Sequence, residues 1–279
     1  MTRKILDLPY ASLSPAQKAD IHLPENGPAP FPVILAIHGG AFMGGDKADG
    51  QVTPMLTGLL RGYAVVSVNY RMSGEAKFPA LVQDVKAVIR WIRANAGTYR
   101  LNPAKIAAWG SSAGGYLAAM VGVSEGISVL EDLSLGNPEQ SSRVQAVVDW
   151  FGPTDFLMMD EQLGAYGLAP DAKHAHNSEF SPESLLMGAQ ITTIPQQVQA
   201  ANPERYIRAD APPFLIEHGT RDNLVPCLQS ITFAKKLMAI LGPDKVTLDL
   251  LEGAGHADPR FETPENLQKV FVFLDSWLK

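Results

Sequence analysis

The sequence contains a single cysteine among its 279 residues. One thiol cannot form a disulfide within the chain, and it excludes a metal cluster held by several cysteines. The chain also lacks an excess of positive charge, because 23 Lys and Arg against 29 Asp and Glu give a net charge of −6. That balance argues against nucleic acid as a partner and against a basic membrane anchor.

Long apolar runs are absent as well. No stretch approaches the roughly 18 uninterrupted apolar residues of a membrane helix. The opening residues 1–13 lack the apolar core and the small-residue cleavage site of a secretion signal. We therefore expect a soluble, cytoplasmic protein without a membrane partner. Secretion from a trimmed precursor would leave the same sequence and stays open.

The composition is that of a folded globular protein, with 46% hydrophobic and 19% charged residues. Its length suits either two domains or one large α/β domain. Apolar runs rich in β-branched and aromatic residues recur at 31–38, 63–70, 106–109, 144–151, 214–218 and 246–251. Such runs suit strands covered on both faces, and helical patterns lie between them. The alternation predicts a parallel sheet.

The pattern from Leu81 to Ala96 is the clearest helix signal. Its apolar residues recur every three or four positions, while Lys86, Arg90 and Arg93 occupy the opposite, polar face.

A segment of about sixty residues, 156–210, interrupts the alternation without an obvious strand. It is rich in methionine and aromatic residues, and loops of this length are uncommon unless they have a function. We predict a mostly helical cap over the carboxyl edge of the sheet. We expect the rest of 1–279 to build one domain, because candidate catalytic residues lie on both sides of this segment.

The strongest motif is Gly-Ser-Ser-Ala-Gly at 110–114, which places Ser112 between an apolar strand and an apolar helix. A nucleophilic serine on such a sharp turn needs small neighbours, because side chains at Gly110 and Gly114 would collide with adjacent backbone. Upstream, His38-Gly39-Gly40-Ala41-Phe42 follows another strand, and its glycines allow backbone N–H groups to approach a substrate oxygen.

A serine nucleophile needs a histidine base and a carboxylate that orients it. Of the six histidines, His38 belongs to the glycine loop, His22 precedes any predicted site, and His218 ends a strand. His174 and His176 are a weak metal signal and are interpreted as an exposed polar loop. This leaves His256, after the last predicted strand.

Asp222 follows the preceding strand and is the preferred carboxylate, with Asp258 as the alternative. Asp244 and Asp249 lie before and within the last strand, facing the wrong end or face. The order Ser112, Asp222, His256 is the Ser–Asp–His order of α/β-hydrolases.

The chain resembles α/β-hydrolases, and more narrowly hormone-sensitive-lipase-type and bacterial feruloyl-esterase-like carboxylesterases. The resemblance depends on HGGAF (38–42), GDK (45–47), NYR (69–71), FPA (78–80), GSSAGG (110–115), FGPTD (151–155), HGTRDNLVP (218–226) and GAGH (253–256). It implies a mostly parallel eight-stranded sheet with helices on both faces and a small cap. It also implies an ester substrate and neither a metal nor an organic cofactor.

The resemblance further implies that Ser112 is the nucleophile, His256 the general base and Asp222 its orienter. The oxyanion donors would be the backbone N–H groups of Gly40, Ala41 and Ala113. Ala41 stands where many relatives carry a third glycine. Because it would contribute only its N–H, we expect catalysis to survive and the pocket wall to change.

Substrate choice is less defined by the sequence. The candidate pocket residues are Phe42, Met43, Phe156, Leu157, Met158 and Met159. An adaptable, methionine-rich apolar wall suits short acyl or aryl groups. We expect hydrolysis of acetyl, feruloyl-type or other short-chain esters by a monomer or homodimer. An arylformamidase-like amide hydrolase and a non-catalytic binding protein of the same fold are the alternatives.

Overall fold

The computed structural model describes residues 3–168 and 175–279. Its centre is an eight-stranded sheet in the order β1-β2-β4-β3-β5-β6-β7-β8. The strands are β1 (Arg3–Pro9), β2 (Lys18–Leu23), β3 (Phe31–Ile37), β4 (Ala64–Val68), β5 (Leu101–Ser111), β6 (Ala146–Trp150), β7 (Phe214–Gly219) and β8 (Val246–Leu251). Strands β3 to β8 pair in parallel, whereas β2 is antiparallel to both of its neighbours.

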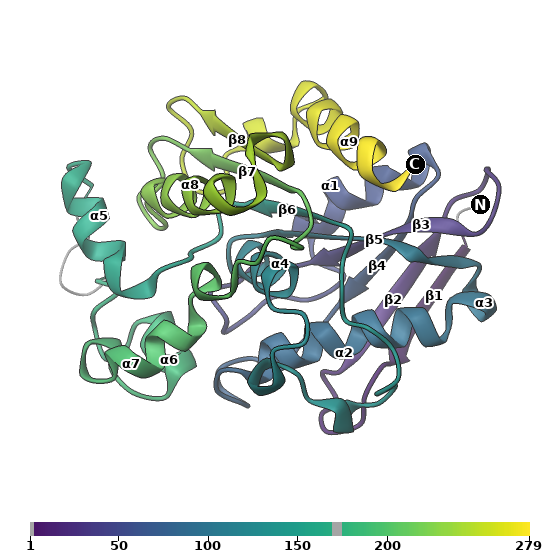
Figure 1. Cartoon of the computed structure of the whole chain (residues 1–279), viewed down its shortest axis with the longest axis horizontal. Helices are drawn as coiled ribbons and strands as arrows, with labels where there is room; N and C mark the ends of the chain where they lie inside the picture. Colours follow the sequence, from purple (N-terminus) through teal and green to yellow (C-terminus); the bar gives the residue numbers. More distant parts are fainter. Residues whose placement is uncertain (1–2, 169–174) are drawn as a thin grey trace.

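Helices cover both faces of this sheet (Figure 1). The α-helices are α1 (Thr53–Leu56), α2 (Ala80–Ala94), α3 (Ala96–Tyr99), α4 (Ala113–Val123), α5 (Met159–Ala165), α6 (Pro182–Met187), α7 (Pro195–Val198), α8 (Leu228–Leu241) and α9 (Pro264–Leu278). The 3-10 helices are η1 (Gly50–Val52), η2 (Thr57–Arg61), η3 (Ser128–Leu130), η4 (Leu133–Leu135), η5 (Phe156–Met158), η6 (Ile191–Thr193), η7 (Gln199–Ala201), η8 (Pro203–Tyr206), η9 (Pro243–Lys245) and η10 (Pro259–Glu262).

The pleat of β3 shows how the two layers form. Leu35 and Ile37 join the apolar core beneath α2, α4 and α8, while Ile34 and Ala36 join the core beneath α1 and α9. Because both faces are buried, the strand is apolar at nearly every position, as the sequence pattern indicated. The mostly parallel eight-stranded sheet with helices on both faces confirms the expected α/β-hydrolase fold.

Two strands were not evident from the residue pattern. β1 is an edge strand and most of its side chains face solvent, so it has no apolar run. β2 is buried but contains Asp20, which pairs with Lys47 at 2.9 Å. A buried ion pair therefore interrupts the apolar pattern that marks the other strands.

Two charged residues on the polar face of α2 are buried in the structure. Lys86 and Arg90 are fully buried. Lys86 Nζ lies 2.8 Å and Arg90 Nη1 2.7 Å from the two carboxylate oxygens of Glu131. The connection between α4 and β6 supplies this carboxylate and covers the helix. The helical repeat in the sequence does not show that residues distant in the chain will cover the charged face of the helix.

The segment 156–210 lies between β6 and β7, and its described residues contain short helices and no strand. Helices α5, α6 and α7 gather on the side of the molecule away from both termini (Figure 1). Buried Gln229 of α8 anchors the start of this segment. Its Oε1 accepts the N–H groups of Thr154 and Asp155 at 2.7 and 2.6 Å, and its Nε2 donates to Gln162 Oε1 at 2.7 Å.

Glu217 on β7 gives the fold a testable pH dependence. Its side chain is fully buried, and Asn266 Nδ2 of α9 donates to its Oε2 at 3.1 Å. Burial raises the pKa of Glu217 from its ordinary 4.5 to about 7. The folded protein therefore holds this proton more tightly than the unfolded chain, and the contribution of Glu217 to stability falls as the pH rises from about 4.5 to about 7.

We expect Glu217→Gln to remove this dependence, because the amide does not ionise. The difference in free energy of unfolding in urea, Glu217→Gln minus wild type, should increase by about 2–3 kcal/mol from pH 5 to pH 8. Glu139→Gln is the control, since Glu139 is exposed. Parallel pH curves for wild type and Glu217→Gln would contradict the prediction.

Candidate active site

Ser112 occupies the sharp turn between β5 and α4. Its backbone has φ 55° and ψ −121°, which a non-glycine residue adopts only under strain. The turn is fixed by a hydrogen bond from the Ser112 N–H to the Trp150 carbonyl at the end of β6, at 2.8 Å. The strain is thus held by the neighbouring strand.

The glycines around Ser112 are required by close backbone packing. A Cβ at Gly110 would lie 2.1 Å from the Gly114 carbonyl oxygen, and a Cβ at Gly114 would lie 2.1 Å from the Ile37 carbonyl oxygen. A side chain at Gly110 would push β5 away from the first turn of α4, and one at Gly114 would push that turn away from the end of β3. The structure therefore gives the physical reason for the small residues in the motif.

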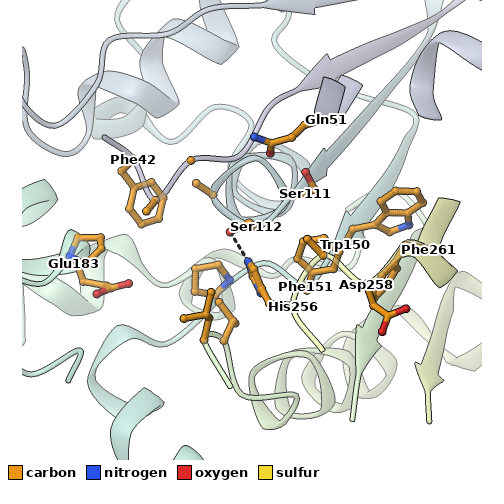
Figure 2. A pocket seen from close by; sticks show the side chains of 18 of the residues that line it. Phe42, Gln51, Ser111, Ser112, Trp150, Phe151, Glu183, His256, Asp258 and Phe261 are labelled. Carbon is orange, nitrogen blue, oxygen red and sulfur yellow. Dashed lines mark hydrogen bonds between the residues drawn. The ribbon is translucent and has the colours of Figure 1, made fainter. Parts of the chain in front are cut away.

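His256 lies between Ser112 and Asp222 and contacts both. Figure 2 shows its hydrogen bond with Ser112. Its Nε2 lies 3.0 Å from Ser112 Oγ, and its Nδ1 lies 2.7 Å from Asp222 Oδ2. An ionised carboxylate only accepts, so Nδ1 carries the proton and Nε2 is free to accept the serine hydroxyl. The ring of Phe151 packs edge-on against His256, with centroids 4.8 Å apart. The three residues follow β5, β7 and β8, at one edge of the sheet.

Asp222 is buried, and its second oxygen is also occupied. Oδ1 accepts the N–H groups of Leu224 and Val225, each at 2.9 Å. Burial opposes ionisation, yet hydrogen bonds from His218 and His256 hold the pKa of Asp222 well below its ordinary range. The carboxylate therefore stays negative at neutral pH.

Asp258, the alternative carboxylate, has a different partner. It accepts Arg260 Nε at 2.8 Å and caps the N-terminus of η10. Of the two candidates, Asp222 is the one hydrogen-bonded to His256.

The predicted oxyanion donors lie around the same cavity as Ser112: Gly40 and Ala41 from the glycine loop, and Ala113 from α4. Ala41 has φ 54° and Phe42 has φ 63°, so the loop holds two strained non-glycine residues. The N–H of Ala113 starts a helix and has no intrahelical acceptor. Because α4 begins directly after Ser112, the positive end of its dipole lies at the serine.

His38 supports this loop. Its ring stacks on Tyr70 with centroids 4.6 Å apart, and Nδ1 lies 2.7 Å from the Gly39 carbonyl oxygen. Burial lowers the pKa of His38, so the ring is neutral. His38 therefore fixes the loop conformation and is separate from the Ser112–His256 pair.

The cavity beside Ser112 measures about 400 Å³ and is mainly apolar. Four aromatic side chains line it: Phe42, Trp150, Phe151 and Phe261. Figure 2 shows Phe42 and Glu183 on one side of Ser112, with Trp150, Phe261 and Asp258 on the other. Apolar walls with a few placed polar groups are typical of small-molecule sites.

Most of the predicted pocket residues do not line this cavity. Phe42 does, but Met43 is about half exposed to solvent, at 49%. Phe156 and Met159 are fully buried, because η5 and α5 pack them onto the core. Met158 and Leu157 border a different cavity, beside Lys236. The structure therefore places Met43, Phe156, Leu157, Met158 and Met159, predicted as pocket wall, outside the lining of this cavity.

The segment 156–210 contributes His176 and Glu183 instead, together with Pro182. His176 Nδ1 lies 3.0 Å from Glu183 Oε2, and its Nε2 lies 2.8 Å from the Leu224 carbonyl oxygen. Both partners are acceptors, so this geometry holds the doubly protonated ring. Burial opposes that charge, but Glu183 raises the pKa of His176. His176 thus links the segment 156–210 to the Asp222 loop, rather than being an exposed residue. His174 lies outside the described residues.

Other cavity residues could have been found from the sequence. Trp150 and Phe151 lie at the end of the apolar run of β6. Ser112, Asp222 and His256 likewise follow the ends of β5, β7 and β8. The carboxyl ends of parallel strands meet at one edge, where ligands bind in open α/β sheets. Gln51 and Phe261, which also line the cavity, had no such signal.

Within residues 3–168 and 175–279, no group of three or more His, Cys, Asp or Glu side chains is placed to hold a metal ion. No helix in these ranges has both the length and the apolar character needed to cross a membrane.

Comparison with known families and proteins gives consistent matches. The family model BD-FAE matches residues 19–237. The chain is 32% identical over 239 residues to "Probable carboxylic ester hydrolase LipM" of Mycobacterium tuberculosis, a match that covers 84% of this chain and 52% of that protein. "Esterase LipQ" of the same organism is 30% identical over 90% of this chain and 56% of its own length. The chain thus spans about half the length of the curated relatives it matches.

Two solved structures are similar over 99% of this chain. One, "Truncated form of carbohydrate esterase from gut microbiota", is 31% identical with a TM-score of 0.85, and 96% of that chain is covered. The other, a "Bifunctional GH43-CE" of Bacteroides eggerthii, is 33% identical with a TM-score of 0.88, and 35% of that chain is covered.

Proposed function

Because the chain belongs to the BD-FAE family, we propose that it is a serine carboxylesterase with Ser112 as nucleophile, His256 as general base and Asp222 as the orienting carboxylate. The observation that carries the proposal is the continuous hydrogen-bond chain from Ser112 Oγ through His256 to Asp222, beside a mainly apolar cavity. This arrangement matches the geometric roles of a catalytic triad.

The reaction has two acyl-transfer steps. In the first, Ser112 Oγ attacks the ester carbonyl carbon while its proton passes to His256 Nε2. The tetrahedral intermediate then expels the alcohol, which takes that proton from His256, and the acyl group stays on Ser112. In the second step His256 removes a proton from water, whose oxygen attacks the acyl carbon. Collapse releases the carboxylic acid and returns the proton to Ser112 Oγ.

The negative oxygen of each intermediate is held by the backbone N–H groups of Gly40, Ala41 and Ala113. Such donors act only on charge that develops in the transition state, and one of them typically contributes about 3–4 kcal/mol. The strained loop of Ala41 and Phe42 and the first turn of α4 fix these groups before the substrate binds. The substitution of a third glycine by Ala41 leaves the N–H available.

The substrates we propose are acetyl and hydroxycinnamoyl esters of carbohydrates, with other short-chain esters also accepted. The cavity of about 400 Å³ and its aromatic walls suit an acyl group of modest size or one aromatic ring. One solved relative of this chain is named a carbohydrate esterase, which supports a sugar as the alcohol. The lining also includes the carboxylates of Glu183 and Asp258, on opposite sides of Ser112 (Figure 2), which already contact His176 and Arg260.

The test is a substrate panel scored by kcat/KM. It contains p-nitrophenyl esters of increasing acyl length, methyl ferulate, an acetylated xylo-oligosaccharide and formanilide as the amide. We expect the acetyl and feruloyl esters to have the highest kcat/KM, and long-chain esters and the amide to be poor substrates. Faster hydrolysis of formanilide would favour the arylformamidase-like alternative. Preference for long acyl chains would contradict the proposed substrate class.

A fluorophosphonate probe separates the enzyme from a non-catalytic binding protein of the same fold. The probe reacts with an activated serine, so the folded wild-type protein should be labelled at Ser112 and lose its esterase activity in proportion. A folded protein that is neither labelled nor active on the panel would exclude the proposed function.

A further inference from the structure

His218 lies at the end of β7 and is fully buried. Its Nδ1 is 2.7 Å from Ser230 Oγ, on the first turn of α8. Its Nε2 is 2.8 Å from the Val225 carbonyl oxygen and 3.3 Å from Asp222 Oδ2. The ring therefore lies behind the triad carboxylate, on the side away from the substrate cavity.

These partners define the protonation of the ring. A carbonyl and a carboxylate only accept, so Nε2 must carry a proton and donate to both. Ser230 can donate its hydroxyl proton to Nδ1, which stabilises the neutral ring with its proton on Nε2. If the Ser230 hydroxyl were absent, the proton could move to Nδ1. The Nε2 lone pair would then face the oxygens of Asp222 and Val225, which is repulsive.

His218 adds a further contact to the Asp222 carboxylate. Oδ1 accepts the N–H groups of Leu224 and Val225, Oδ2 accepts that of His256, and His218 Nε2 lies 3.3 Å from Oδ2. Both Asp222 and His218 have side chains fully shielded from solvent. Water therefore cannot easily replace a lost donor, and an unpaired buried acceptor is costly.

We propose that His218 is a positioning residue for Asp222 and that Ser230 holds it in the donor tautomer. The chain of hydrogen bonds then runs Ser230–His218–Asp222–His256–Ser112. His218 fixes the rotation of the carboxylate, so that Oδ2 faces His256 Nδ1 in each step of the reaction. Phe151 supports the same arrangement, because its ring packs edge-on against both imidazoles, at 4.8 and 6.5 Å. This inference rests on the proposed esterase function.

Ser230→Ala is the decisive variant, because it removes one hydroxyl at a distance from the substrate cavity. Without the Ser230 hydroxyl, the His218 proton can move to Nδ1, and the ring then no longer donates to the charged Asp222 carboxylate. We expect this loss to lower kcat about 10- to 100-fold, while KM stays within about twofold. Ser67→Ala is the matched control. Ser67 is fully buried on β4, and its hydroxyl has no hydrogen-bond partner in the described part of the chain, so this variant should keep the wild-type kcat.

A double-mutant cycle tests whether Ser230 acts through His218. We expect His218→Phe to lower kcat at least as much as Ser230→Ala does, and Ser230→Ala to cost nothing more in the His218→Phe background. Additive effects in the cycle, or a Ser230→Ala kcat within twofold of the Ser67→Ala control, would overturn the proposal. If His218→Phe fails to fold, Ser230→Ala and its control decide the outcome alone. A wild-type protein inactive on the whole ester panel would mark failure of the proposed function instead.

Discussion

Replacing Ser112 by Ala should abolish ester hydrolysis and lower kcat by about five to six orders of magnitude, the usual cost of removing a triad nucleophile. Without Oγ there is no group to form the acyl-enzyme, although the cavity and the oxyanion loop remain. The fold should be unaffected. The turn is held by the Ser112 N–H and by close glycine packing, and alanine leaves both in place.

Initial rates on p-nitrophenyl acetate measure this effect, and urea unfolding measures stability. Ser67→Ala again serves as the control, since it removes a buried hydroxyl away from the site. Retained turnover in folded Ser112→Ala would show that the nucleophile is misassigned. Loss of stability together with activity would instead mean that the serine side chain maintains the turn.

Replacing Asp222 by Asn should lower kcat by about 10⁴-fold, the cost typical of this change in a serine triad. The amide removes the negative charge that stabilises protonated His256. It can also present its NH₂ group to Nδ1, which favours the tautomer with the proton on Nε2. In that tautomer His256 cannot accept the serine proton. KM should change little, because Asp222 is buried behind His256.

Asp258→Asn is the matched control, with the same chemical change in a carboxylate two residues from His256. Its ion pair with Arg260 is at the surface, so we expect kcat to stay within about tenfold of the wild-type value. Exposed pairs of this kind contribute little. If Asp258→Asn lost activity and Asp222→Asn did not, the carboxylate would have to be reassigned. Both variants are compared by kcat on the same ester.

Part of the fold followed directly from local patterns. The strands β3, β4 and β6 and the second half of β5 are mostly apolar because helices cover both faces, and a one-dimensional pattern suffices to find them. The apolar pattern does not identify β1 and β2. One is a solvent-facing edge strand and the other contains Asp20, whose buried charge is stabilised by Lys47 from a distant loop.

The two residues of the hydrogen-bond chain that starts at Ser112 were also predictable from the sequence. The sharp turn limits its neighbours to small residues, and the ends of successive parallel strands meet at one edge. His256 and Asp222 could therefore be chosen by their positions after β8 and β7, and the structure places His256 within hydrogen-bond distance of both Asp222 and Ser112. Their roles in catalysis are what the variants test.

The cavity wall was not predictable in the same way. Methionine and aromatic residues near the start of the segment 156–210 suggested a wall, but Phe156 and Met159 pack into the core. The wall includes Glu183 and His176 instead, because α6 and the chain before it fold back over the serine. Which side of a short helix faces a cavity depends on what packs against its other side.

By itself, the sequence determined the order of the strands along the chain, the strained turn around Ser112 and the chemistry of the residues after β7 and β8. Each of these depends on neighbours within a few positions, so local spacing is enough. Only the tertiary structure decided which buried charges find partners, which side chains enclose the cavity, and that Ser230 and His218 lie behind Asp222. Those outcomes depend on contacts between distant segments, because a buried polar group is stable only where the fold supplies its hydrogen-bond partner.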